Sequence, residues 1–188
     1  MRVIGGKYRR RKLESLPGLE TRPMLDRVRE TLFNILQDQV AGKVFADLYA
    51  GTGAVGIEAL SRGASRSYFV ENNGKATRVI DANLTSVGAQ SSASVLLRPV
   101  AEALESIEAD IYFLGPPYPL KGEYTKTLTA LSEKPCELVI AQHSVKLDLA
   151  EEFEQLKLTD RRKLGANVLS FYRPSADEPD PPIRNEQP

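Results

Sequence analysis

The chain has 188 residues, of which 41% are apolar and 27% charged, so it is long enough to bury a core and fits one globular domain rather than two. Its 25 basic and 25 acidic side chains balance, which argues against a protein coated all over in nucleic acid. No apolar run suits a signal peptide or a membrane span, and Cys136 and His143, each the only residue of its type, cannot form a zinc-ligand cluster; we therefore expect a soluble cytoplasmic protein without membrane or metal partners.

The chain begins with a strongly basic segment that carries no acid up to position 12. Gly5 and Gly6 within it are typical of a hairpin turn, so we expect two short strands. We define residues 1–20 as the basic arm, a β-hairpin extension of the main domain. Its density of positive charge favours RNA phosphate contact, with strongly salt-dependent binding, through Arg2, Lys7, Arg9, Arg10, Arg11 and Lys12.

A helix is predicted after the basic arm, because Thr21 can cap it and Pro23 can open it. Its apolar positions fall on one face: Val28, Leu32, Ile35 and Leu36.

From residue 43 onward, segments with the pattern of buried strands alternate with segments of helical pattern. Such repetition predicts an α/β domain, assigned to residues 21–173, with a parallel sheet and helices on its faces. The last two apolar segments, 153–164 and 167–173, suit an antiparallel hairpin at one edge of the sheet. The Pro-rich, acidic residues 174–188 have little to bury and are expected to be disordered.

A glycine-rich loop joins the strand predicted at 43–50 to the following helix, with Gly51, Gly53 and Gly56 in the order G-x-G-x-x-G. Glycines let backbone approach a ligand closely, and the helix start offers free N–H groups. Glu71 ends the next strand, where an acid can accept hydrogen bonds from ribose hydroxyls. The pattern indicates a nucleoside-containing cofactor and leaves both NAD and S-adenosylmethionine open.

Asp47 separates these two cofactors, because a negative charge at the strand end suits a cationic sulfonium better than a pyrophosphate. A dehydrogenase would also need a proton-handling group, and His143 is the only histidine. The residues favour S-adenosylmethionine. The structural alternative is a tight strand-to-helix turn with a surface acid.

The apolar segment 110–114 is followed by Gly115-Pro116-Pro117-Tyr118. With this loop, the chain carries a series of motifs that together resemble the RsmD-type family of 16S rRNA (guanine-N2)-methyltransferases: MRVIGGKYRRRKL, TRPMLDRVRETLFNIL, DLYAGTGAVGIEALSRGA, YFVE, PPY, HS and LSFYR. The resemblance implies a Rossmann-like, seven-stranded methyltransferase sheet, S-adenosylmethionine as methyl donor, a basic hairpin that grips RNA, and a substrate in small-subunit ribosomal RNA or its assembly.

Carried over by position, the resemblance assigns the methionine part of the cofactor to Asp47, Gly51 and Gly53, and its ribose to Glu71. It assigns the cover of the cofactor pocket and the target base to the segment with Thr21, Arg22, Pro23, Asp26 and Arg29. The catalytic loop is Gly115, Pro116, Pro117 and Tyr118.

Two acids of the family pattern are replaced in this chain. Val100 or Pro99 stands where an Asp would bind the adenine amino group, and Gly115 stands for the Asp of the family's DPPY loop. In the family that Asp and the first proline's carbonyl accept the two N–H bonds of the base amine, and the aromatic residue stacks on the flipped base. Asp110 lies too far back along its strand to substitute, whereas Glu102 and Glu123 are candidates.

Loss of one positioned group predicts a rate penalty on the order of 10² to 10³. The sequence therefore leaves two functions open: an active RNA methyltransferase, and a catalytically impaired RNA-binding or ribosome-assembly homologue. A DNA amine methyltransferase is the third alternative, because the loop chemistry is shared.

Overall fold

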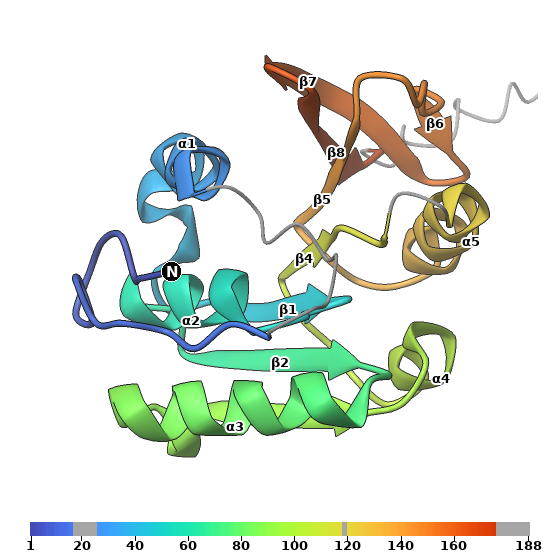
Figure 1. Cartoon of the computed structure of the whole chain (residues 1–188). Helices are drawn as coiled ribbons and strands as arrows, with labels where there is room; N and C mark the ends of the chain where they lie inside the picture. The colour runs from blue at the N-terminus through green and yellow to red at the C-terminus, as the bar shows by residue number, and fades with distance from the viewer. Residues whose placement is uncertain (17–25, 118–119, 176–188) are drawn as a thin grey trace, which may run out of the picture.

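The computed structural model describes residues 1–16, 26–117 and 120–175. Its centre is a single sheet of eight strands in the order β3-β2-β1-β4-β5-β8-β7-β6 (Figure 1). The strands are β1 (Val44–Leu48), β2 (Arg66–Glu71), β3 (Ala93–Leu97), β4 (Ile111–Leu114), β5 (Leu138–Ser144), β6 (Glu152–Phe153), β7 (Leu156–Leu164) and β8 (Asn167–Pro174). β1 to β5 are parallel to one another, which confirms the α/β architecture expected from the alternating pattern.

The C-terminal hairpin is confirmed as well. β7 pairs with β8 antiparallel, and β8 pairs antiparallel with β5. The expected count of seven strands is low by one, because the two-residue strand β6 pairs with β7 at the outer edge. β8 also includes Pro174, which the sequence had assigned to the tail; Pro lacks an N–H donor and is tolerated at a strand end. The rest of the predicted tail, from residue 176, lies outside the described residues.

Helices cover both faces of the sheet: α1 (Asp26–Leu36), α2 (Ala54–Ser61), α3 (Gly74–Val87), α4 (Val100–Leu104) and α5 (Lys121–Ser132), with short 3-10 turns η1 (Gln37–Val40) and η2 (Gln90–Ser92). One apolar cluster joins α1, α2, α3 and the basic arm to one face of the sheet. A second cluster joins α4 and α5 to the opposite face. Strand residues therefore alternate between two cores; Phe113 belongs to the first and Leu114 to the second.

The helices begin and end where their sequences dictate. Asn73 caps α3, its side-chain oxygen accepting hydrogen bonds from the N–H groups of Lys75 and Ala76. Gly88 ends the same helix in the left-handed conformation, at φ 72°. The predicted cap Thr21 and opening Pro23 of α1 lie outside the described residues.

The basic arm folds back on itself, but the two predicted strands reduce to a single antiparallel bridge between Arg2 and Lys12. The backbone around this bridge is held by the hydrogen bonds from Val3 N–H to Arg11 O and from Leu13 N–H to Met1 O, each 3.0 Å long. The described part of the arm, residues 1–16, pairs with no strand of the sheet and instead lies along α2 (Figure 1). Its contacts to α2 replace the ladder that a longer hairpin would have formed.

No helix of the described residues is long and apolar enough to cross a membrane.

Candidate active site

The candidate site lies where the parallel strands end. In the strand order, β1 lies between β2 and β4, whose helical connections cover opposite faces of the sheet. In such open sheets, ligands bind in the crevice beyond the carboxyl ends of the strands at this reversal. The glycine loop follows β1, Glu71 is the last residue of β2, and Gly115 follows β4, so all three lie at this edge of the sheet (Figure 1).

The glycine loop has a backbone conformation that depends on its glycines. Gly51 and Gly53 have φ values of 58° and 77°, in the left-handed region that side chains disfavour. A Cβ added at Gly51 would meet no atom of the described residues within 4 Å, so these residues leave space for a ligand beside this backbone. Gly56 serves packing instead: a Cβ there would lie 2.4 Å from the Phe69 ring.

Glu71 is tied directly to the glycine loop. One of its carboxylate oxygens accepts the Gly51 N–H at 2.9 Å and the other accepts the Asn73 N–H at 2.9 Å. The residue is half-buried, and each carboxylate oxygen can accept more than one hydrogen bond. Glu71 is therefore held in place with acceptor capacity left for a ligand such as ribose.

Asp47 corrects one expectation. It is buried at 1% exposure and accepts the Gly56 N–H at 2.8 Å, so it lies beneath the loop and the surface-acid alternative is wrong. Burial raises the pKa of Asp47 to about 8, assisted by Glu71 and opposed by the Gly56 N–H and Arg29. The negative charge predicted at this position is thus disfavoured at neutral pH, and the visible role of Asp47 is to bond the start of α2.

Tyr49 is strained at the start of the same loop, with φ 63°, a value that bulky side chains rarely adopt. Its hydroxyl bonds Thr127 at 2.8 Å and donates to Glu123 at 3.2 Å, both on α5. α5 thereby fixes the loop from the opposite face of the sheet, and Glu123 is engaged there. Glu102, the other candidate acceptor, is exposed on α4.

Val100 is buried in the core between α4 and the sheet, as the first residue of α4. Its side chain therefore packs, and it offers no polar group of its own to a cofactor.

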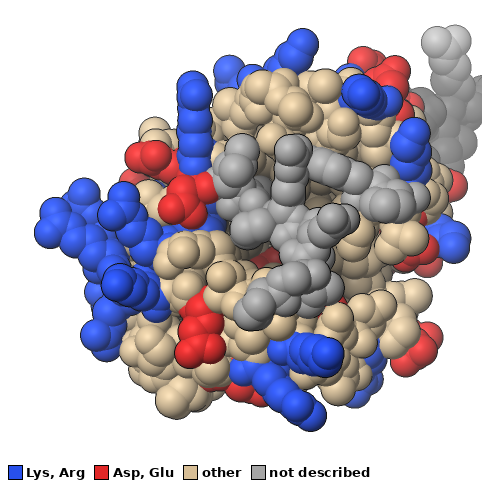
Figure 2. All heavy atoms as spheres, viewed as in Figure 1, with Lys and Arg blue, Asp and Glu red and all other residues tan. Residues whose placement is uncertain are grey.

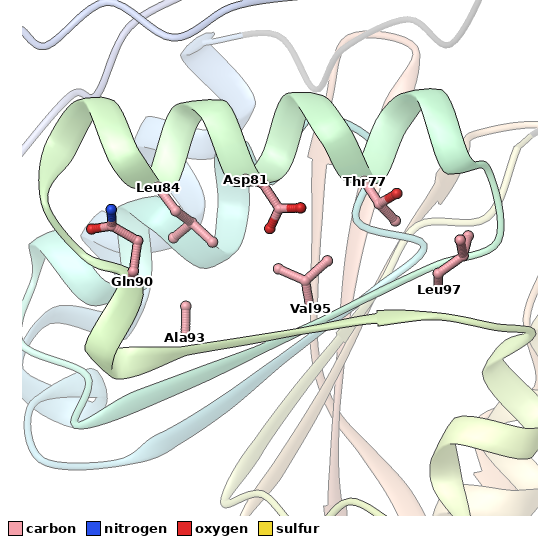
Figure 3. Close-up of a pocket in the computed structure, with 7 residues that line it drawn as sticks. All are labelled: Thr77, Asp81, Leu84, Gln90, Ala93, Val95 and Leu97. Atoms are coloured by element: carbon pink, nitrogen blue, oxygen red, sulfur yellow. The ribbon is translucent and has the colours of Figure 1, made fainter.

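A cavity of about 420 Å³ lies between α3 and the edge strand β3 (Figure 3). None of the candidate site residues lines it, and Asp81 is its one titratable group, so we do not assign the active site to it.

The structure describes the loop after β4 from Gly115 to Pro117. Gly115 is half-buried, Pro116 buried and Pro117 exposed. The Tyr124 hydroxyl donates to the Gln142 carbonyl at 2.8 Å and lies 3.4 Å from the Pro116 carbonyl, linking the loop to β5. Tyr118, Thr21 and Arg22, three further predicted site residues, lie outside the described residues.

His143 has a structural place. It is buried at 2% exposure, with one ring nitrogen 2.9 Å from the Ser170 hydroxyl and the other 3.0 Å from the Ser144 carbonyl. Burial lowers the pKa of His143, so the neutral ring is favoured.

The predicted RNA-binding side chains of the basic arm are all exposed, and Figure 2 shows Lys and Arg gathered over this part of the molecule. Beneath them the arm is anchored to a buried acid: Glu58 of α2 accepts the N–H groups of Ile4 and Gly5 at 2.8 Å each. Glu58 also pairs with Arg62 at 2.9 Å and Arg29 at 3.7 Å. Ser61 adds a bond from the Tyr8 N–H at 2.8 Å.

Arg29 of α1 also binds the basic arm and pairs with Glu58. Its guanidinium is fully buried, donates to the Arg2 carbonyl and pairs with Asp26 at 3.0 Å. Burial lowers the pKa of Arg29, whereas Asp26 and Glu58 oppose the shift. Asn83 of α3 makes a second link, donating to the carbonyls of Glu14 and Thr52 and so joining the arm to the glycine loop.

Sequence reasoning did not find Glu58, Ser61 or Asn83. A signal for Glu58 was present, because it is the only charged residue in the apolar helical segment AVGIEALS. An acid in such a segment is buried only with partners.

The family model described as conserved hypothetical protein 95 matches residues 1–173. The chain belongs to this family. It is the RsmD-type family expected from the motifs: ribosomal RNA small subunit methyltransferase D of Escherichia coli K12 is 35% identical over 136 residues, which cover 71% of this chain and 67% of that protein. YlbH of Bacillus subtilis is 32% identical over 92% of this chain and 98% of its own length.

Solved structures agree with the family. The structure of yhhF from Escherichia coli has a TM-score of 0.82 at 30% identity, covering 94% of this chain and 98% of that chain. At 15% identity, an RNA methyltransferase from Salinibacter ruber in complex with S-adenosyl-L-homocysteine has a TM-score of 0.64, with 85% of this chain and 97% of that chain covered. The latter likeness is one of fold. The Rossmann-like methyltransferase architecture predicted from the sequence is thus confirmed.

Proposed function

We propose that this protein is an S-adenosylmethionine-dependent RNA methyltransferase that acts on the exocyclic N2 amine of a guanine in small-subunit ribosomal RNA. The proposal depends on the junction of β1, β2 and β4. There the Glu71 carboxylate accepts a hydrogen bond from the Gly51 N–H, and the loop that begins with Gly115 and Pro116 follows β4 directly. Membership of the RsmD-type family and the exposed charge of the basic arm support the same function.

The residues present fit the cofactor. The described residues leave space beside Gly51, and Glu71 has acceptor capacity for ribose hydroxyls. Bound there, the cofactor would supply an electrophilic methyl group on a sulfonium. Since Val100 is apolar and buried, the adenine end would be held by packing rather than by a carboxylate.

The proposed reaction needs no strong base from the protein. A guanine amine is a weak nucleophile because its lone pair is delocalised, and acceptors for its N–H groups direct that lone pair toward the methyl group. Transfer would leave S-adenosylhomocysteine and an amine with one extra proton, which can pass to water, so the buried, neutral His143 is not needed as a base. The Pro116 carbonyl is one acceptor in this proposal, and Tyr118 is assigned to stack on the base.

Calorimetry followed by methyl transfer tests the proposal. S-adenosylmethionine should bind the protein, and Glu71→Ala should weaken its binding by about ten-fold or more, because a charged acceptor is lost. Labelled methyl groups should then pass to small-subunit RNA or particles and not to DNA. Binding of RNA without transfer would favour the impaired homologue, and transfer to DNA would favour the DNA amine methyltransferase.

A further inference from the structure

The space beside Gly115 is bordered by a side chain of the neighbouring strand. Leu114 pairs with Ala141 in the β4–β5 register, so Gly115, which follows β4, lies beside Gln142, which is still within β5. A Cβ added at Gly115 would lie 3.2 Å from the Gln142 Oε1 atom and 3.6 Å from the Phe113 ring. An amide oxygen therefore stands next to the position from which a side chain at 115 would project.

The side chain and the backbone of Gln142 are each held by a hydrogen bond. Its Nε2 donates to the Asn167 Oδ1 atom at 2.9 Å, which turns the amide oxygen toward Gly115. The Gln142 backbone carbonyl accepts the Tyr124 hydroxyl at 2.8 Å, and the same hydroxyl lies 3.4 Å from the Pro116 carbonyl. The buried Tyr124 hydroxyl thus connects the backbone of Gln142 with the Pro116 carbonyl, whereas the Gln142 amide oxygen is oriented by the contact of its amide nitrogen with Asn167.

The three described acids that the sequence offers as substitutes, Asp110, Glu123 and Glu102, do not border Gly115. Asp110 accepts the Val44 N–H at 2.7 Å, at the opposite end of β4. Glu123 accepts the Tyr49 hydroxyl, and Glu102 is exposed on α4. Among the described residues, Gln142 carries the side-chain oxygen closest to where a residue 115 side chain would begin.

An amide oxygen accepts an N–H bond as a carboxylate does, without charge and independently of pH. We propose that Gln142 provides the side-chain acceptor for the methyl-accepting amine that Gly115 cannot provide, with the Pro116 carbonyl as the second acceptor. The inference rests on the proposed function. It names the polar contact that selects an amine-bearing base, and it explains how the loop works with glycine at 115.

The test compares the wild type with Q142A, G115D and the double variant G115D/Q142A in methyl transfer to small-subunit RNA. Q142A should lose about 10²-fold in kcat, as expected when one preorganised polar group is removed, with unchanged affinity for S-adenosylmethionine. The double variant should regain most of that loss, because a carboxylate at 115 enters the vacated space. Q90A, a change to an exposed glutamine on η2, is the matched control and should transfer methyl groups at the wild-type rate.

Q142E gives a readout that a purely structural role would not produce. It keeps an acceptor oxygen but makes it titratable, so its kcat should fall on the acid side as the carboxylate is protonated, whereas the wild type should lack this limb. Thermal unfolding of every variant shows whether the fold is kept.

Equal kcat in the wild type and Q142A would overturn the inference and leave the proposed function standing. Activity in G115D together with an inactive wild type would also overturn it, since Gln142 would then not replace the acid. Absence of transfer by all four proteins would overturn the proposed function and, with it, the role of Gln142.

Discussion

Asp47 lies buried beneath the glycine loop and bonds the backbone at the start of α2. Its carboxyl group bonds the Gly56 N–H and lies close enough to Glu71 and Arg29 for both to influence its pKa. Since the pKa of Asp47 is raised from 3.8 to about 8, the folded protein holds a proton that the unfolded chain releases. The stability that this group contributes is present below pH 4 and is lost as the pH rises toward 8.

We therefore predict that the free energy of unfolding falls between pH 4 and pH 8, with Asp47 contributing up to about 1.4 kcal/mol per pH unit. Asp47→Asn keeps the acceptor for Gly56 and cannot ionise, so its stability should depend less on pH. Denaturant unfolding at a series of pH values measures both proteins. Identical pH profiles would contradict the burial argument.

A second prediction concerns Gly56, whose added Cβ would lie 2.4 Å from the Phe69 ring and 2.8 Å from the Ser67 hydroxyl. Gly56→Ala should lower the free energy of unfolding by about 1–3 kcal/mol, because α2 must move away from β2. Gly122→Ala is the control: it lies in α5 with no atom within 4 Å of its Cβ, and should be neutral or stabilising by up to about 1 kcal/mol. Equal effects would show that helix propensity, and not packing, decides.

The basic arm is attached to the helices beneath it by a buried cluster of charged side chains, Glu58 of α2 and Arg29 of α1. Glu58 and Arg29 are both fully buried, and they bind backbone groups of the arm rather than its charged side chains. The arm's cations are thereby left exposed, as the proposed contacts with phosphate require. Removing one partner of such a buried pair leaves an uncompensated charge, so the cluster specifies where the arm lies.

The arm's position should depend on Gly6. With φ 73° and a Cβ position only 1.8 Å from the Ser61 carbonyl oxygen, Gly6→Ala cannot keep the present contact with α2. We expect a loss of about 1–3 kcal/mol in stability and roughly ten-fold in RNA affinity, measured by thermal unfolding and filter binding. Gly42→Ala, at φ 76° with no atom within 4 Å, carries the same backbone strain and should keep RNA affinity. Unchanged RNA affinity in Gly6→Ala would contradict the arm's role.

For the molecule as a whole, the fold was predictable because local patterns agree with it. Alternating strand and helix patterns indicated the parallel sheet, and the last two apolar segments indicated its antiparallel edge. The glycine loop and Glu71 were predicted as neighbours and are hydrogen-bonded. Strand β6 was missed because two residues carry no periodic pattern.

The site was less predictable, because its decisive contacts join residues distant in sequence. Glu58 bonds Ile4 and Gly5 across 54 and 53 positions, and no local pattern announces such a pair. Asp47 was predicted to place a negative charge beside the cofactor, and its burial was not foreseen because burial follows from packing that sequence spacing does not give. Gln142 became a candidate once the β4–β5 register placed its oxygen beside Gly115.

The exposed cations of the basic arm predict that the affinity for RNA falls as the salt concentration rises. Changing Arg9, Arg10 and Arg11 to Gln should reduce the slope of log affinity against log salt by about 2 to 3, since each phosphate contact contributes about 0.7 to 0.9. Their guanidinium groups are exposed, so stability should stay within about 0.5 kcal/mol of the wild type. A slope equal to that of the wild type would exclude the arm from the phosphate contacts.

The most direct test of the central claim is nucleoside analysis of small-subunit particles that lack the modification, after incubation with this protein and isotopically labelled S-adenosylmethionine. We expect the label to appear as N2-methylguanosine in the ribosomal RNA, and Q142A to produce about 10²-fold less of it in the same time. Label in another nucleoside would contradict the assigned substrate. No label at all, with S-adenosylmethionine bound to the protein, would contradict the assignment of this chain as a working RNA methyltransferase.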